Sequence, residues 1–109
     1  MIRREIWTAS GGRDYAGKPR PVVILQSDRF SALDSVTVCP FTTDQIEAPL
    51  LRLEIDPTED NGLKKPSKIM VDKLTTVART KLGRRIGQLG KEDMLCLDRA
   101  VATFLGLAD

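Results

Sequence analysis

An arginine followed by a proline, Arg20-Pro21, opens a run of β-branched residues directly after a glycine-containing segment. Proline holds the residue before it in an extended conformation, which restricts the backbone of Arg20. A guanidinium is always charged and can grip phosphate oxygens in pairs, so an arginine at a strand entrance beside a loop is suited to phosphate binding. The competing interpretation is a strand-edge arginine in solvent. An isolated Arg-Pro pair is common, and by itself it favours this second interpretation.

The absence of histidine narrows the possible chemistry further. It removes histidine general acid–base catalysis, Ser-His-Asp and Cys-His nucleophiles, and most zinc sites. The sequence has no GxxxxGK[ST] or GxGxxG pattern, and the acidic segment 56–60 is typical of a solvated loop rather than a magnesium site. We therefore expect no cofactor and no metal. Any catalysis must use Arg, Lys, Asp, Glu, Thr, Ser or Tyr.

The elements that would position Arg20 are short strands. Strand-favouring types or alternating apolar residues occur in segments 2–9, 20–26, 35–41 and 50–55, with one or two further short strands in 67–77. The apolar run that follows Arg20 predicts a strand buried on both faces. In segment 50–55, Leu51, Leu53 and Ile55 share one face, with Arg52 and Glu54 opposite. Glycines and a proline predict a loop at 10–19, and Asn61-Gly62 predicts a turn.

The last element is a helix. Its apolar residues recur at spacings of three and four, which places them on one stripe: Met94, Leu97, Val101, Phe104 and Leu105. Gly90 is suited to the N-cap and Gly106 to the C-terminal end. Several short strands and one helix predict a single α+β domain over 1–109, with a strongly bent antiparallel sheet or small barrel.

Composition places the chain among compact intracellular proteins. Hydrophobic residues make up 41% and charged residues 29%, and no apolar run is long enough to cross a bilayer or to act as a secretion signal. We therefore expect a cytoplasmic location and no membrane contact. Cys39 and Cys96 form no CxxC motif, and we expect reduced thiols, although an oxidised pair stays open. Segments 30–60 and 61–91 carry net charges of −6 and +8. Such segregation either forms a positive face for a phosphate backbone or remixes on folding.

The succession of motifs along the chain resembles the MazF/PemK proteins. Glu5-Ile6-Trp7, a glycine-containing loop and Arg20-Pro21-Val22-Val23-Ile24 are similar to the opening of that family. Val36 to Thr42 is similar to its strand ending in Pro-hydrophobic-Thr. Gly62-Leu63, Ser67 to Asp72, Ile86-Gly87-Gln88-Leu89 and the final helix follow in the same order. No single motif is specific, but the succession covers nearly the whole chain.

The resemblance implies a CcdB/PemK-like fold, a small SH3-like barrel with a C-terminal helix. Members of the family are homodimers that cleave single-stranded RNA at short sequences and are inhibited by a cognate antitoxin protein. Part of the helical stripe would then serve the dimer contact. By position, Arg20 and Thr42 match the catalytic Arg and Thr of the family, and Asp72 matches an acidic residue implicated in some members.

Cleavage by the 2′-hydroxyl of the RNA itself needs no protein nucleophile and no metal, only in-line geometry and charge stabilisation at phosphorus. Thr43 is an alternative to Thr42, because neighbouring residues of an extended strand point to opposite faces. The general base stays open between Glu5, Asp72 and a loop residue, each of which is also suited to a structural role. The expected RNA-binding residues are Lys18, Gln26 and Lys73.

Three departures from the family separate two versions of the site. The arginine of the family's Asp-Gln-x-Arg-Thr stretch is missing after Asp72, Met70 stands where some members have an arginine, and the first loop has no histidine. These departures favour a site centred on Arg20 and Thr42. Two alternatives remain: a CcdB-like inhibitor of DNA gyrase that binds through the end of the last helix, and a catalytically inactive RNA- or protein-binding barrel.

Overall fold

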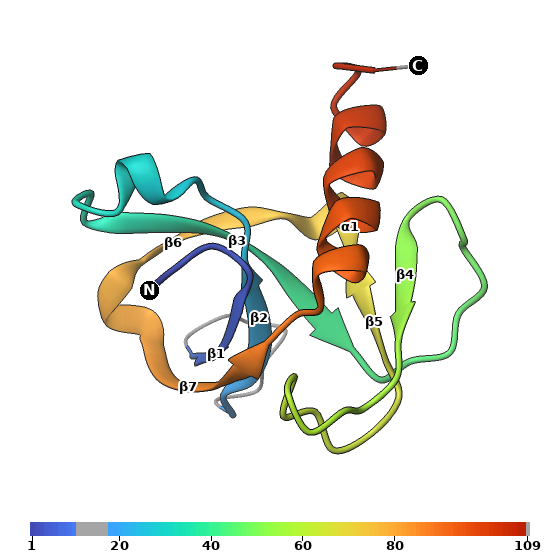
Figure 1. Cartoon of the computed structure of the whole chain (residues 1–109), viewed down its shortest axis with the longest axis horizontal. Coiled ribbons are helices and arrows are strands. Elements are labelled where there is room, and N and C mark those ends of the chain that lie inside the picture. The colour runs from blue at the N-terminus through green and yellow to red at the C-terminus, as the bar shows by residue number, and fades with distance from the viewer. Residues whose placement is uncertain (11–17, 109) are drawn as a thin grey trace.

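The computed structural model describes residues 1–10 and 18–108, and their strands form one antiparallel sheet (Figure 1). This part of the chain contains seven strands: β1 (Glu5–Ala9), β2 (Arg20–Ile24), β3 (Ser35–Thr42), β4 (Arg52–Ile55), β5 (Ser67–Met70), β6 (Thr75–Ala78) and β7 (Leu82–Gln88). Three short 3₁₀ helices, η2 (Asp28–Phe30), η3 (Val71–Lys73) and η4 (Arg79–Lys81), precede the helix α1 (Lys91–Phe104). Residues 11–17 of the predicted 10–19 loop lie outside the described residues.

Strand β3 organises the sheet because it has two partners along one edge. Its first half pairs with β6 from Ser35 to Val38, and its last two residues pair with β5. The strand order is β4-β5-β3-β2-β1-β7, with β6 beside β3. The α+β fold with a bent antiparallel sheet and a C-terminal helix is therefore confirmed. In the described part of the chain, β6 and β7 are not paired with each other. Closure of the sheet into an SH3-like barrel therefore stays a prediction.

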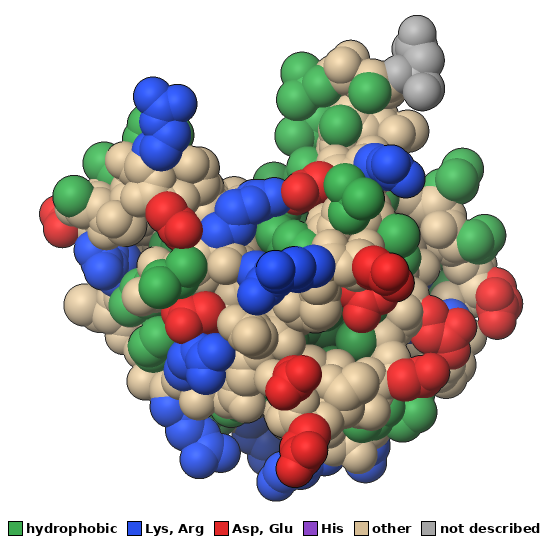
Figure 2. Space-filling view, viewed as in Figure 1, with side chains coloured by type: hydrophobic (Ala, Val, Ile, Leu, Met, Phe, Trp, Pro, Cys, Tyr) green, Lys and Arg blue, Asp and Glu red, His purple; other side chains and the backbone are tan. Residues whose placement is uncertain are grey.

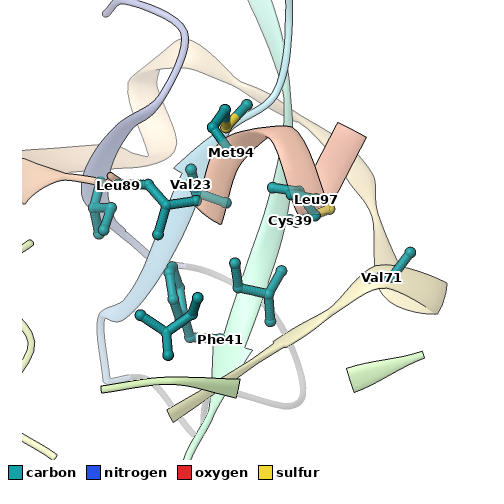
Figure 3. Packing of buried hydrophobic residues seen from close by; sticks show 10 residues of the cluster. Val23, Cys39, Phe41, Val71, Leu89, Met94 and Leu97 are labelled. Carbon is teal, nitrogen blue, oxygen red and sulfur yellow. The ribbon is translucent and has the colours of Figure 1, made fainter. Parts of the chain in front are cut away.

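The two faces of β2 and β3 bury different clusters of apolar side chains. One cluster contains Val23, Cys39 and Phe41 and is covered by α1, whose Met94 and Leu97 lie over it (Figure 3). The other contains Val22, Ile24, Val36 and Val38. Because successive side chains of a strand point to opposite faces, a strand buried on both faces is apolar at consecutive positions, as β2 is from Val22 to Ile24. The predicted burial of this strand on both faces is confirmed.

The helix begins after Gly90 as its N-cap, as predicted, and ends before Gly106, which has a left-handed φ of +76°. Its apolar stripe divides into two parts. Met94 and Leu97 are buried in the core, whereas Phe104 and Leu105 are 44% and 50% exposed, because this end of the helix stands clear of the sheet (Figure 1). No helix in the described ranges is long and apolar enough to span a membrane.

Strand β7 was not among the predicted strands, and the predicted Asn61-Gly62 turn packs against it. Gly62 has a φ of +69°, and a Cβ there would lie 2.0 Å from the carbonyl oxygen of Ile86. A Cβ at Gly87 would lie 2.4 Å from the carbonyl oxygen of Asp60. Gly87, which interrupts the strand pattern of β7, is thus also the residue of β7 that admits the close approach of the turn.

Candidate functional site

A cleft of about 430 Å³ opens where β2 begins and β3 ends. Its lining residues come from β2, β3, the connection from β3 to β4, β4, β5 and η3: Arg20, Pro21, Phe41, Thr42, Thr43, Asp44, Ile46, Arg52, Ser67, Met70 and Lys73. Three of these side chains are cationic and one is a carboxylate. The cleft therefore combines a partly apolar lining with an excess of positive charge, which suits an anionic ligand that carries flat apolar groups.

Arg20 and Thr42 come together because β2 and β3 are antiparallel neighbours. Val22 pairs with Pro40, and the same register continued by two residues sets Arg20 opposite Thr42. Opposed residues in such a pair have Cβ atoms about 5 Å apart. Arg20 is exposed, and none of the ion pairs among residues 1–10 and 18–108 uses its guanidinium. The extended start of β2 thus presents a positive charge beside the hydroxyl of Thr42.

The hydroxyl of Thr42 also shapes the chain that leaves β3. Its Oγ1 accepts a hydrogen bond from the backbone N–H of Asp44 at 3.1 Å. Thr43 is exposed and lines the cleft as well, so the structure brings Arg20, Thr42, Thr43 and Lys73 to one place. It does not separate Thr42 from Thr43 as the functional hydroxyl.

A buried lysine anchors the connection between β3 and β4. Lys68 on β5 is 6% exposed, and its Nζ donates a hydrogen bond to the carbonyl oxygen of Ile46 at 3.1 Å. A buried ammonium is costly unless it is hydrogen-bonded, so this contact is strongly preferred once the sheet has formed. It holds Ile46, and with it one wall of the cleft, over β5.

Asp72 does not line the cleft but holds a residue that does. Its Oδ1 accepts a hydrogen bond from Nη1 of Arg52, and the two side chains are 26% and 14% exposed. The alternating sequence pattern places Arg52 only on the polar side of its strand. No sequence signal specified its register against Met70 of β5, which is what carries the guanidinium into the cleft.

Glu5 lies at the far end of β1 from this site. Ala9 pairs with Arg20, and Glu5 is four residues away, roughly 13 Å along the strand. Burial would raise the pKa of Glu5. Hydrogen bonds from the Ile2 backbone, the Trp7 indole and the Arg85 guanidinium, together with the charge of Arg85, outweigh burial and lower the pKa. These contacts give Glu5 a structural role.

The other predicted RNA-binding residues occupy different places. Lys73 lines the cleft, while Lys18 is exposed two residues before Arg20 and is not part of the lining. Gln26 lies past the opposite end of β2. Its amide donates to the Phe30 carbonyl and accepts from the Thr37 N–H, both at 3.1 Å. The structure therefore does not bring Gln26 to the cleft, and its role in binding RNA stays a prediction without geometric support.

The two cysteines are free, Cys39 buried and Cys96 exposed, so the oxidised pair left open by the sequence is not formed. Burial raises the pKa of the Cys39 thiol to about 12, which makes it unreactive. No group of three potential metal-ligating side chains occurs within the described ranges. The expectation that the protein needs no metal stays a prediction.

Comparisons with known proteins agree with the fold. Residues 2–105 match the family described as PemK-like, MazF-like toxin of type II toxin-antitoxin system. A probable endoribonuclease MazF of Mycolicibacterium smegmatis is 53% identical over 108 residues, which cover 99% of both chains. The solved Mycobacterium tuberculosis toxin MazF-mt6 is 31% identical with a TM-score of 0.81, covering 97% of this chain and 100% of that one.

A mycobacterial endoribonuclease solved with its cognate antitoxin shares the fold at 21% identity and a TM-score of 0.82, covering 100% of this chain and 98% of that one. The fold and site thus define an α+β protein with a basic cleft at the ends of two antiparallel strands. The chain belongs to the PemK-like, MazF-like toxins of type II toxin–antitoxin systems. The predicted family is confirmed.

Proposed function

We propose that the chain is a metal-independent endoribonuclease that cleaves single-stranded RNA in the cleft, with Arg20 and Thr42 at the cleaved phosphate. The observation that carries the proposal is the position of these two side chains, from neighbouring strand ends, in one basic cleft. The 53% identity to a probable endoribonuclease over almost the whole chain supports the same activity.

The reaction follows from the groups available. The 2′-oxygen of the RNA attacks the adjacent phosphorus, the bond from phosphorus to the 5′-oxygen breaks, and a 2′,3′-cyclic phosphate and a 5′-hydroxyl result. The 2′-hydroxyl loses a proton and the leaving 5′-oxygen gains one. The nucleophile belongs to the substrate, so the protein needs to align it and to stabilise the charge that develops on the phosphate.

Arg20 and Thr42 supply that stabilisation. The guanidinium can donate two parallel hydrogen bonds to the non-bridging oxygens, and the hydroxyl of Thr42 donates one more while still accepting from Asp44. Removing one preorganised donor of this kind costs about 10²–10³-fold in kcat.

Neither carboxylate named from the sequence is well placed as the general base. Glu5 is at the far end of β1, and Asp72 is engaged by Arg52. Asp44 is the carboxylate that lines the cleft in the described part of the chain. A pH–rate profile of Asp44→Asn tests whether Asp44 accepts the proton. Loss of the acidic limb of the profile would identify Asp44 as the general base, and an unchanged profile would exclude it.

The expected partners follow from the same family. A cognate antitoxin segment would compete with RNA for the cleft. A second copy of the chain would cover apolar surface at the end of α1. Figure 2 shows hydrophobic side chains gathered at this projecting end of the molecule. Phe104, Leu105 and Leu107, at the end of the helix and just after it, are exposed. The protein would act in the cytoplasm, on RNA in its single-stranded regions.

The test is cleavage of a mixed pool of single-stranded RNA in excess EDTA by the wild type, Arg20→Ala, Thr42→Ala and Thr43→Ala. Arg29→Ala is the matched control, because Arg29 is exposed on η2, at the other end of β2 and β3 from the cleft. We expect cleavage by the wild type and the control, and losses of at least about 10²-fold for Arg20→Ala and Thr42→Ala.

A larger loss for Thr43→Ala than for Thr42→Ala would reassign the hydroxyl. Intact RNA with the wild type, combined with growth arrest on expression, would contradict the proposed function and favour a gyrase-binding or other non-catalytic toxin.

A further inference from the structure

Arg52 places a second guanidinium in the cleft, from a strand three positions away in the sheet from the strand of Arg20. It opens β4 and pairs with Met70 of β5, whereas Arg20 opens β2. Strands β5 and β3 lie between them, so the two backbones are three strand spacings apart, roughly 14 Å measured along the bent sheet. Both side chains line the same cleft. The separation suits two different phosphates of one RNA strand better than one shared phosphate.

The donors of Arg52 are divided between the protein and the cleft. Nη1 donates to Oδ1 of Asp72 and to the carbonyl oxygen of Leu51, the latter at 3.3 Å. Nη2 and Nε have no hydrogen-bond acceptor among the described residues. In this part of the chain, every buried side-chain nitrogen or oxygen has a hydrogen-bond partner, so these two nitrogens are not buried. These remaining donors therefore reach solvent. The Arg52 side chain is only 14% exposed and lines the cleft, so the solvent that these donors reach is the solvent in the cleft.

Asp72 is fixed by the backbone in the position where it meets Arg52. The N–H of Val71, the first residue of η3, donates to the Leu51 carbonyl oxygen at 2.9 Å, and this is the carbonyl that also accepts from Arg52. The start of β4 and the η3 turn are thus tied together at the ion pair. A guanidinium held this way loses little rotamer freedom when it binds a ligand, which favours binding.

We propose that Arg52 binds a backbone phosphate of the RNA next to the one that Arg20 holds, and that Asp72 is the residue that positions Arg52 rather than the general base. This inference rests on the proposed function and adds a second phosphate site to it. Nη2 and Nε of Arg52 donate to the phosphate, while the hydrogen bonds from Nη1 to Asp72 and Leu51 set the orientation of the guanidinium. Because this phosphate does not react, its binding lowers the energies of substrate and transition state together.

The experiment compares Arg52→Ala, Arg52→Lys and Asp72→Asn with the Arg29→Ala control, in cleavage kinetics and in binding of a 2′-deoxy oligonucleotide that cannot be cleaved by this route. For Arg52→Ala we expect Kd and KM to rise on the order of tenfold, with kcat within a few-fold of wild type. The slope of log Kd against log salt should fall by about 0.7, the loss of one phosphate contact to a single strand.

Arg52→Lys should keep the salt slope and recover part of the affinity, since it retains the charge without the fork. Asp72→Asn should keep the salt slope and lower kcat less than tenfold, with the pH–rate profile unmoved. Melting curves identify any variant that fails to fold. If Arg52→Ala fails to fold, the more conservative Arg52→Lys takes its place in the comparison.

The inference is overturned if Arg52→Ala and Arg52→Lys bind and cleave like Arg29→Ala. It is also overturned if Asp72→Asn abolishes kcat or removes the acidic limb of the profile, which would make Asp72 the base. Wild-type protein that neither binds nor cuts RNA would instead refute the proposed function itself, so the two failures are distinguishable.

Discussion

The salt dependence of RNA binding should reveal the cationic lining of the cleft. Arg20, Arg52 and Lys73 line it. Each phosphate that a cation neutralises on single-stranded nucleic acid contributes a slope of about −0.7 to log K against log salt. Three contacts give a slope of about −2, so raising salt from 50 to 200 mM should weaken binding roughly twenty-fold.

The assay is fluorescence anisotropy with a 2′-deoxy oligonucleotide, which reports binding without cleavage. Arg20→Ala should reduce the slope to about −1.4, because one of three contacts is lost. Arg29→Ala, which removes an equal charge far from the cleft, should leave the slope unchanged. A slope near zero, or equal slopes for wild type and Arg20→Ala, would refute the assignment of the cleft as the surface that binds the RNA backbone.

Three further predictions concern stability and reactivity. Gly62→Ala should lower the free energy of unfolding by at least about 2 kcal/mol in urea, since φ is +69° and the new Cβ would meet the Ile86 carbonyl at 2.0 Å; a smaller loss would show that the turn can move away from β7. Glu5→Gln should cost about 1–3 kcal/mol at pH 7. Because the pKa of Glu5 is lowered on folding from its ordinary value of about 4.5, its contribution to stability is present above that value and is lost as the pH falls through the lowered value. Thermal melts across pH check this, and a difference between wild type and Glu5→Gln that persists at pH 2 would contradict it. A thiol reagent at pH 8 should modify Cys96 alone in the native protein and both thiols in denaturant, because burial raises the pKa of Cys39 to about 12; native labelling of two thiols would contradict it.

Strand β2 was predictable because its sequence and its surroundings agree. An apolar run after Arg20-Pro21 can be buried on both faces, and that is what the two core clusters do. The helix was predictable for the same reason, from periodicity and from glycines at its two ends. Strand β7 was not, because Gly83, Arg84, Arg85 and Gly87 interrupt the usual pattern. The two glycines are explained only by close contacts with Thr8 and Asn61, which are far away in the chain.

The candidate site divides in a similar way. Arg20 and Thr42 were named together through family resemblance, since nothing in the sequence specifies that β2 and β3 are neighbours in the register that sets these residues opposite each other. Arg52 was missed for the same physical reason. Alternation placed it on the polar side of its strand, but only the pairing of β4 with β5 and the turn at η3 bring it to Asp72 and the cleft. Gln26 is the opposite case. It is a polar residue close to a sequence motif, but its side-chain amide bonds to the backbone of Phe30 and Thr37 at the far end of β2.

The chemistry of the cut ends tests the central claim most directly. A single-stranded RNA incubated with the wild-type protein in excess EDTA should yield fragments ending in a 2′,3′-cyclic phosphate and beginning with a 5′-hydroxyl, and replacing the 2′-hydroxyl at the cut nucleotide by hydrogen should stop the reaction. Fragments with a 3′-hydroxyl and a 5′-phosphate, or continued cleavage of the 2′-deoxy substrate, would contradict the account.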